Sequence, residues 1–337
     1  RLLQTLEAPD LRVVPLYDAL RGQKVDEGPD DLFLRPVRAL GQGLEGQVVP
    51  VAIHHQGWEP VAFTVHRAIG LGPGRHLLPG VVVDRYGDYL ALQTLSQGTD
   101  RAKEEIVGVL VDLLAPKGIV ERNDPKVRGL EGLEQTVSVL HGEVPEKIEV
   151  NEGDVRLQVD LRKGQKTGLF LDQRENHLVA RAYARGRALD CFTYDGGFAL
   201  QMARDADEVL AVDLSSESLE RVKANAEANG LENVTPRDAN VFDLLRAFDD
   251  EGERFDTVIL DPPAFAKSRK AVDKAVRGYK EINLRALKIL NPGGCLITCS
   301  CSYHVHEDDF ERLLTEAAVD AGVTVSVVEK RRQARDL

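Results

Sequence analysis

The sequence contains few cysteine, methionine and aromatic residues and no long apolar run, and these shortages exclude some classes of protein. Among its 337 residues there are four cysteines, one methionine and one tryptophan, and aromatic residues make up 5%. No run of about 18 apolar residues and no signal-peptide pattern is present, so neither a membrane span nor secretion is predicted. Because the sequence begins at Arg1 without a methionine and stops at Leu337 on a charged segment, we expect it to be trimmed.

The few cysteines are concentrated in one place. Three of them, Cys295, Cys299 and Cys301, fall in one predicted strand, and Cys191 stands apart. Residues so placed cannot form a disulfide framework, which predicts a reducing, cytoplasmic location. A zinc site that adds His304 and His306 is not predicted, because a straight strand separates Cys295 and Cys301 by about 20 Å at ~3.3 Å per residue.

Basic residues are outnumbered, with 43 Lys and Arg against 55 Asp and Glu, and the net charge of −12 argues against non-specific binding of nucleic acid. One local basic segment exists between residues 267 and 280, and a solvated helix face is the alternative interpretation of it. The segment follows an Asp-Pro-Pro corner, so we predict that it binds phosphate groups beside an active site. The residues predicted to contact this phosphate-bearing substrate are Lys267, Arg269, Lys270, Arg277 and Tyr279. A smaller basic group precedes it at Arg162, Lys163 and Lys166.

The chain divides into three parts that differ in hydrophobic periodicity and glycine content. Residues 1–72 show weak periodicity and end near a glycine-rich stretch, which indicates a separate N-terminal domain. Residues 73–147 contain short strand patterns and one helical stretch at 103–114, which predicts a small α+β domain. Residues 148–337 open with a hairpin pattern and then alternate strands with helices.

That alternation predicts an α/β domain. Apolar strands are expected at 187–192, 208–214, 255–260 and 294–300, with a shorter one near Val234, and helices at 216–229 and 278–290. Continuous apolar strands alternating with helices indicate a parallel sheet that is covered on both faces. Ligands bind such sheets at the carboxyl ends of the strands, where the motifs described next are found.

The first motif is ALDCFTYDGGFAL. Asp190 closes a predicted strand, and Gly196 and Gly197 precede a helix whose free N–H groups favour an electronegative ligand. Asp213 ends the next strand, where its carboxylate could accept hydrogen bonds from ribose hydroxyls. These features predict a nucleoside-containing cofactor but do not choose between NAD and S-adenosylmethionine (SAM).

Two later motifs favour SAM. Asn240 and Val241 offer a polar and an apolar group suited to an adenine ring. The DPPAF corner that starts at Asp261 presents a carboxylate and rigid prolines with unpaired backbone carbonyls, which is an arrangement suited to a planar base. Cys301 follows the neighbouring strand at the same level.

The ordered segments LPGVVVDRYGDYLALQ, GQKTGLFLDQREN, ALDCFTYDGGFAL, ILDPPAFAKS, AVRGYKEIN and LNPGGCLITCSCS resemble the SAM-dependent ribosomal RNA cytosine-5 methyltransferases that carry an N-terminal PUA domain, typified by the bacterial large-subunit enzyme. The resemblance covers about three quarters of the chain. It implies a class I (Rossmann-like) methyltransferase fold, a PUA-like N-terminal domain, SAM as cofactor and large-subunit ribosomal RNA, 23S in bacteria, as partner. Residues 1–72 do not themselves show the PUA pattern, and a homodimer is compatible with the sequence.

Motif position in this family also implies roles for single residues. Cys301 is implied as the nucleophile and Asp261 as the group between cofactor and base. The implied cofactor-binding residues are Gln173, Asp190, Phe192, Tyr194, Gly196, Gly197, Asp213, Leu214, Asn240, Val241 and Asp261.

The chemistry explains the need for a cysteine. Cytosine C5 is a weak nucleophile, and a thiolate that adds to C6 converts the ring to an enamine whose C5 can attack a methyl group. We expect the SAM sulfonium and the basic segment at 267–280 to favour the thiolate. Two alternatives remain at this point, namely an exocyclic-amine methyltransferase that uses the Asp-Pro-Pro corner without a cysteine, and a non-catalytic RNA-binding module.

Overall fold

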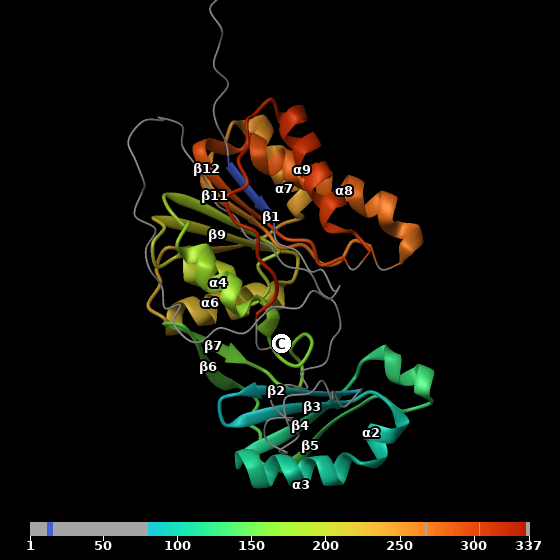
Figure 1. Ribbon diagram of the computed structural model, residues 1–337. Helices are drawn as coiled ribbons and strands as arrows, with labels where there is room; N and C mark the ends of the chain where they lie inside the picture. The colour runs from blue at the N-terminus through green and yellow to red at the C-terminus, as the bar shows by residue number, and fades with distance from the viewer. Residues whose placement is uncertain (1–11, 16–79, 267, 303, 335–337) are drawn as a thin grey trace, which may run out of the picture.

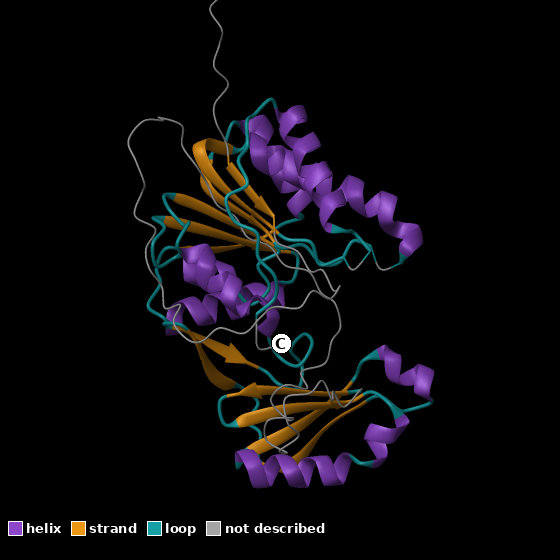
Figure 2. Ribbon diagram, viewed as in Figure 1, coloured by secondary structure: helices purple, strands orange, loops and turns teal. Residues whose placement is uncertain are grey.

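The computed structural model describes residues 12–15, 80–266, 268–302 and 304–334, which form two sheets joined through a hairpin (Figures 1 and 2). The larger sheet has six parallel strands in the order β1-β12-β11-β8-β9-β10. Their bounds are β1 Arg12–Pro15, β8 Arg187–Cys191, β9 Glu208–Asp213, β10 Val234–Asp238, β11 Phe255–Leu260 and β12 Leu290–Thr298. The predicted α/β fold with a parallel sheet is confirmed.

Helices cover both faces of this sheet, as Figure 1 shows. One face packs against α7 (Val241–Glu251), α8 (Val272–Lys288) and α9 (Glu307–Ala321). The other face packs against α4 (Arg174–Arg181), α5 (Gly197–Met202) and α6 (Ser216–Ala228). Side chains alternate along the buried strands, so Leu296 enters the first core while Cys295 and Ile297 enter the second.

The strand order places a topological switch point between β8 and β11. From β8 the chain continues outward to β9 and β10, then crosses back to β11 and β12 on the other side. In open parallel sheets the carboxyl ends of the strands beside such a point form a crevice that binds ligands. The loops after β8 and β11 are therefore the expected walls of a site.

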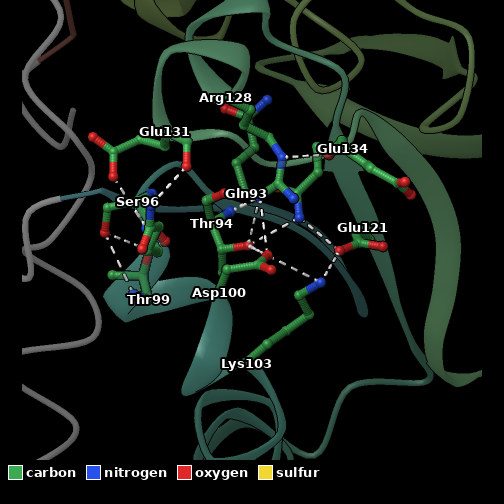
Figure 3. A network of polar contacts seen from close by, with 12 residues as sticks. Gln93, Thr94, Ser96, Thr99, Asp100, Lys103, Glu121, Arg128, Glu131 and Glu134 are labelled. Atoms are coloured by element: carbon green, nitrogen blue, oxygen red, sulfur yellow. Dashed lines mark hydrogen bonds and ion pairs between the residues drawn. The ribbon is translucent and has the colours of Figure 1, made fainter.

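The smaller sheet has the order β2-β3-β4-β5, with only the β3–β4 pair parallel. Its strands are β2 Val81–Tyr86, β3 Tyr89–Thr94, β4 Gly118–Asn123 and β5 Thr136–Gly142, accompanied by α2 Gln97–Arg101, α3 Lys103–Leu114 and the 3-10 turn η1 Lys126–Glu131. Figure 3 shows a polar network under this turn, in which buried Arg128 donates to the carbonyl of Thr94 and to Asp100. Buried charges of this kind are tolerated because each one is paired.

A hairpin of β6 (Ile148–Glu152) and β7 (Val155–Val159) lies between the two sheets (Figure 1). Its apolar side chains belong to a core cluster that also contains Tyr86 and Val120 of the smaller sheet and Leu200 of α5. The two sheets are thus joined by a common apolar core as well as by the chain.

Two predicted element boundaries differ from the structure. Helix α8 begins at Val272 rather than at residue 278, and β12 ends at Thr298, so Cys301 lies in the loop beyond the strand. The predicted N-terminal domain at 1–72 lies outside the described residues except for β1, which is an edge strand of the large sheet. The other boundaries, 73–147 and 148–337, remain predictions.

Candidate active site

A pocket of about 750 Å³ lies at the carboxyl ends of β8, β9 and β11. Ten of the predicted site residues line it, namely Gln173, Phe192, Tyr194, Gly197, Asp213, Leu214, Asn240, Val241, Asp261 and Cys301. Asp190 and Gly196 lie behind its wall and are both buried. The structure therefore brings together residues that are up to 128 positions apart in the sequence, from Gln173 to Cys301.

The loop between β8 and α5 has an unusual backbone. Phe192, Tyr194 and Gly196 have φ values of 67°, 49° and 88°, in the left-handed region that only glycine adopts easily. Such conformations persist only where surrounding contacts hold them, and they are concentrated at functional sites. Here the backbone N–H of Tyr194 donates to Asp213 Oδ2 at 3.0 Å. Asp213 thus fixes the loop across the pocket.

Asp213 and Asn240 each organise the start of a helix or a turn. Asp213 Oδ1 accepts from the N–H of Ser215 at 2.9 Å, just before α6. Asn240 is the N-cap of α7, where its Oδ1 accepts from Phe242 N at 2.9 Å. Because capping occupies that oxygen, the amide NH₂ is the group that Asn240 offers to a ligand. Phe242 lies beside it in the pocket, with its ring centroid 5.9 Å from that of Phe265.

Asp190 supports the same loop from behind. Its Oδ2 accepts from Thr193 Oγ1 at 2.6 Å and from Ala199 N at 3.0 Å, whereas Oδ1 is buried without a partner among the described residues. Burial, reinforced by the charge of Asp261, raises the pKa of Asp190 to about 7. Asp190 thus holds the loop from behind, and its cofactor role remains a prediction.

Cys301 and Asp261 meet at the mouth of the pocket. Cys301 Sγ donates a hydrogen bond to Asp261 Oδ1 at 3.5 Å. Cys301 is partly exposed, whereas the other three cysteines of the chain are buried. Cys299 instead accepts a hydrogen bond from Gln173 Nε2 at 3.7 Å. Position and exposure therefore single out Cys301 as the one thiol that a ligand in the pocket can reach.

The groups around Cys301 disfavour ionisation of its thiol. Burial raises the pKa of its thiol well above the ordinary value, and the charges of Asp261 and Asp172 act in the same direction. The charge of Lys166 lowers the pKa. The SAM sulfonium and the segment at 267–280 remain the predicted sources of positive charge for the thiolate.

A buried ion pair on the pocket wall was not predicted. His177 Nδ1 lies 2.7 Å from Glu152 Oε1, and both residues line the pocket. Burial acts to lower the pKa of His177, but Glu152, with Asp261 and Asp190, outweighs it and raises the pKa. The His177 ring packs directly on Gly197, where an added Cβ would lie 2.3 Å from the ring Cε1. Only the side-chain-free Gly197 permits this contact, and the sequence spacing gave no signal for it.

Comparison with known proteins establishes the family. Residues 132–336 match the S-adenosylmethionine-dependent methyltransferase family, and a ribosomal RNA large subunit methyltransferase I from Vibrio cholerae is 43% identical over 266 residues, covering 77% of this chain and 67% of that protein. The chain belongs to the SAM-dependent methyltransferases. A second relative of the same name, from Aliivibrio fischeri, is 44% identical over 264 residues with the same shares covered.

Solved structures agree with this family. A structure described as a SAM-dependent methyltransferase from Streptococcus mutans is 25% identical with a TM-score of 0.60, and the match covers 71% of this chain and 62% of that one. A methyltransferase complexed with S-adenosylhomocysteine matches with the same values. The methyltransferase therefore uses SAM as cofactor.

The residues of the pocket fit that cofactor. The volume of about 750 Å³ suits a ligand of nucleoside size. Asp213 offers carboxylate oxygens for ribose hydroxyls, and Val241 and Phe242 offer an apolar wall for adenine.

The basic segment of the methyltransferase is only partly as predicted. Arg269 and Lys270, on the 3-10 turn η3 (Arg269–Ala271), are exposed, as is Arg277 on α8. Tyr279 was expected to contact RNA, and that expectation is wrong because its side chain is fully buried and its hydroxyl is 2.9 Å from Ser302 Oγ. Lys280 is paired with Glu316 and Asp320. Lys267 lies outside the described residues.

The described residues form neither a metal-binding cluster nor a membrane-spanning helix. Within residues 12–15, 80–266, 268–302 and 304–334, no group of three or more His, Cys, Asp or Glu side chains could hold a metal ion. No helix among the described elements is long and apolar enough to cross a membrane.

Proposed function

We propose that this methyltransferase transfers a methyl group to C5 of a cytosine in large-subunit ribosomal RNA through a covalent bond to Cys301. The observation that carries the proposal is the position of the Cys301 thiol. It is the only partly exposed cysteine of the chain, it lines the cofactor pocket, and it lies 3.5 Å from the carboxylate of Asp261. Exocyclic-amine methylation requires no such thiol.

The chemistry assigns a task to each of these two residues. The Cys301 thiolate adds to C6 of the ring, an S–C6 bond forms, and the π electrons of the C5–C6 bond become available at C5. Asp261 holds the Watson–Crick edge of the base and protonates N3, which stabilises the charge that the addition creates. The cofactor supplies the methyl group. A base then removes the C5 proton, the electrons of the C5–H bond restore the C5–C6 double bond, Cys301 leaves as a thiolate, and N3 returns its proton to Asp261.

Ribosomal RNA as the substrate is supported by relatives and by surface charge. The relatives at 43% and 44% identity are named ribosomal RNA large subunit methyltransferases. Exposed Arg269, Lys270 and Arg277 follow the Asp261 loop in the chain. They supply phosphate-neutralising charge near the active site despite the net charge of −12.

The test is to map 5-methylcytosine in large-subunit ribosomal RNA incubated with SAM and the enzyme. We expect one or a few cytosines to be modified by the wild type and none by Cys301→Ala, while Cys301→Ala still binds SAM. Product methylated on an exocyclic amine, or normal turnover by Cys301→Ala, would exclude the covalent C5 reaction.

A further inference from the structure

The buried hydroxyl of Tyr279 belongs to a junction of hydrogen bonds beside the active site. It lies 2.9 Å from Ser302 Oγ, and the same Ser302 Oγ accepts a hydrogen bond from the backbone N–H of Ala266 at 3.0 Å. Tyr279 and Ser302 are both fully buried. Ser302 can bond to two segments at once because a hydroxyl has two acceptor sites and one proton to donate.

The junction joins the two loops that carry the reacting side chains. Ala266 follows Asp261 in the loop after β11, and Ser302 comes directly after Cys301 in the loop after β12. The ladder of hydrogen bonds between β11 and β12 ends before either loop begins. Contacts outside the ladder must therefore set the distance between the two loops.

Tyr279 anchors this junction to the core of the domain. Its ring packs on that of Phe265 with the centroids 4.6 Å apart, and on that of Phe310 of α9 with the centroids 5.5 Å apart. A Cβ added at Gly278 would lie 3.2 Å from the Phe265 ring, so the glycine lets α8 approach the loop closely. Ring packing and the hydrogen bond to Ala266 thus hold the same loop against α8.

The distance between the loops matters because Cys301 and Asp261 act on the same ring. The proposed reaction places the thiolate at C6 and the carboxyl group at the Watson–Crick edge at the same time, and a misplacement of about 1 Å can cost about 100-fold in rate. The contact between Cys301 Sγ and Asp261 Oδ1 is 3.5 Å long and uses a weak S–H donor. Because that contact is lost when the thiol ionises, it cannot fix the loops during the reaction.

We propose that Ser302 and Tyr279 are a positioning pair that sets the distance between Cys301 and Asp261. The Ser302 hydroxyl ties the cysteine loop to the Asp-Pro-Pro loop, and the Tyr279 hydroxyl ties this junction to α8. Neither residue of the pair lines the pocket, so both act through the two reacting side chains. The inference rests on the proposed function, in which those two side chains meet one base.

The first test needs no RNA. The rate of alkylation of Cys301 by iodoacetamide is measured against pH, with mass spectrometry to identify the modified cysteine. Burial and the charge of Asp261 both raise the pKa of the thiol, so looser loops should lower the midpoint. We expect a decrease of about half a pH unit and about twofold faster alkylation at pH 8 in Ser302→Ala, and smaller changes in Tyr279→Phe.

An unchanged midpoint and rate in both folded variants would overturn the proposal. Tyr279→Phe removes one oxygen atom and keeps the ring packing, so it decides the question by itself if Ser302→Ala does not fold.

The second test separates positioning from binding. In single-turnover methylation of ribosomal RNA, we expect Ser302→Ala to lower the rate at saturating RNA and SAM by about 10- to 100-fold, with both Kd values within about twofold of the wild type. The double variant with Tyr279→Phe should be little slower than Ser302→Ala, because the two hydroxyls act as one unit. Equal losses of binding and rate, or effects that multiply, would contradict the pair.

The matched control is Tyr183→Phe, which removes a hydroxyl that donates to Glu329 at 2.7 Å away from the pocket lining. It should leave the alkylation and methylation rates unchanged, and changes as large as those of Tyr279→Phe would overturn the proposal. Failure of the cytosine-5 reaction is a separate result. Normal methylation by Cys301→Ala would exclude that reaction, while alkylation of Ser302→Ala would still report the distance between the loops.

Discussion

At the scale of the residue, burial controls the protonation of Asp190 behind the pocket wall. Asp190 is buried behind the β8–α5 loop, and its Oδ2 holds the loop through Thr193 and Ala199. Its pKa is raised from 3.8 to about 7, so the folded protein retains a proton that the unfolded chain loses. Between these two values stability must fall as the pH rises, because the folded state binds more protons there.

This linkage gives a prediction for Asp190→Asn. The amide oxygen can accept the same two hydrogen bonds, but it carries no charge at any pH. We expect the variant to gain stability relative to the wild type as the pH rises from 4 to 7, by an amount on the order of 4 kcal/mol for a shift of about three pKa units. Urea unfolding at pH 4 and pH 8 measures it, and an equal difference at both pH values would contradict the account.

Residue identities within motifs were predicted better than their contacts. The sequence placed Asp213, Asp261 and Cys301 at strand ends, and the structure places all three in one pocket. The His177–Glu152 contact joins segments 25 positions apart that no local pattern connects. Spacing alone could not assign this pair a role.

Among the elements, the segment from η3 into α8 combines two functions. Its exposed residues Arg269, Lys270 and Arg277 offer positive charge to solvent. Its buried residues, among them Tyr279 and Ile282, form part of the core over the large sheet. The error over Tyr279 arose because its charged neighbours in the sequence concealed the helical periodicity that turns it inward.

We predict that Arg269→Glu combined with Lys270→Glu weakens binding of ribosomal RNA without changing SAM affinity. Each lost phosphate contact should also reduce the slope of log affinity against log salt by about 1. The matched control is Lys280→Gln, since Lys280 already pairs with Glu316 at 3.1 Å and Asp320 at 2.9 Å. Filter binding at several salt concentrations measures the effect, and equal loss of RNA and SAM binding would indicate a folding defect instead.

At the scale of the whole molecule, the two sheets share an apolar core. Val155 of the hairpin, Tyr86 of the small sheet and Leu200 of α5 belong to one buried cluster. Across the same boundary, Thr167 links the Tyr86 hydroxyl to the loop that carries Lys166. The small sheet therefore supports the active-site loop as well as the core.

This shared core predicts that the described parts unfold together. Val155→Ala removes apolar volume from a side chain that is 1% exposed and should destabilise the protein by about 1–3 kcal/mol. Calorimetry should show one transition moved to lower temperature. Val319→Ala, at a position that is 74% exposed, should leave it nearly unchanged. Two transitions, of which only one shifts, would show that the sheets are independent.

The alternation of strands and helices was enough to predict the parallel sheet and its covered faces. β11 and α3 have the bounds that periodicity predicted, at 255–260 and 103–114. Boundaries failed where apolar runs continue past an element, as at β12, which ends three residues before Cys301. The pairing of β1 with β12 joins residues about 280 positions apart, and no local pattern reports such a contact.

The central claim is that Cys301 forms a covalent bond to cytosine C6. RNA that carries 5-fluorocytidine at the modified position tests it directly, because fluorine cannot leave C5 as a proton does and the adduct accumulates. With SAM present, we predict an enzyme–RNA adduct that survives denaturing electrophoresis in the wild type and in Cys299→Ala, whose thiol is buried. Cys301→Ala should form none, and an adduct of normal yield in that variant would contradict the account.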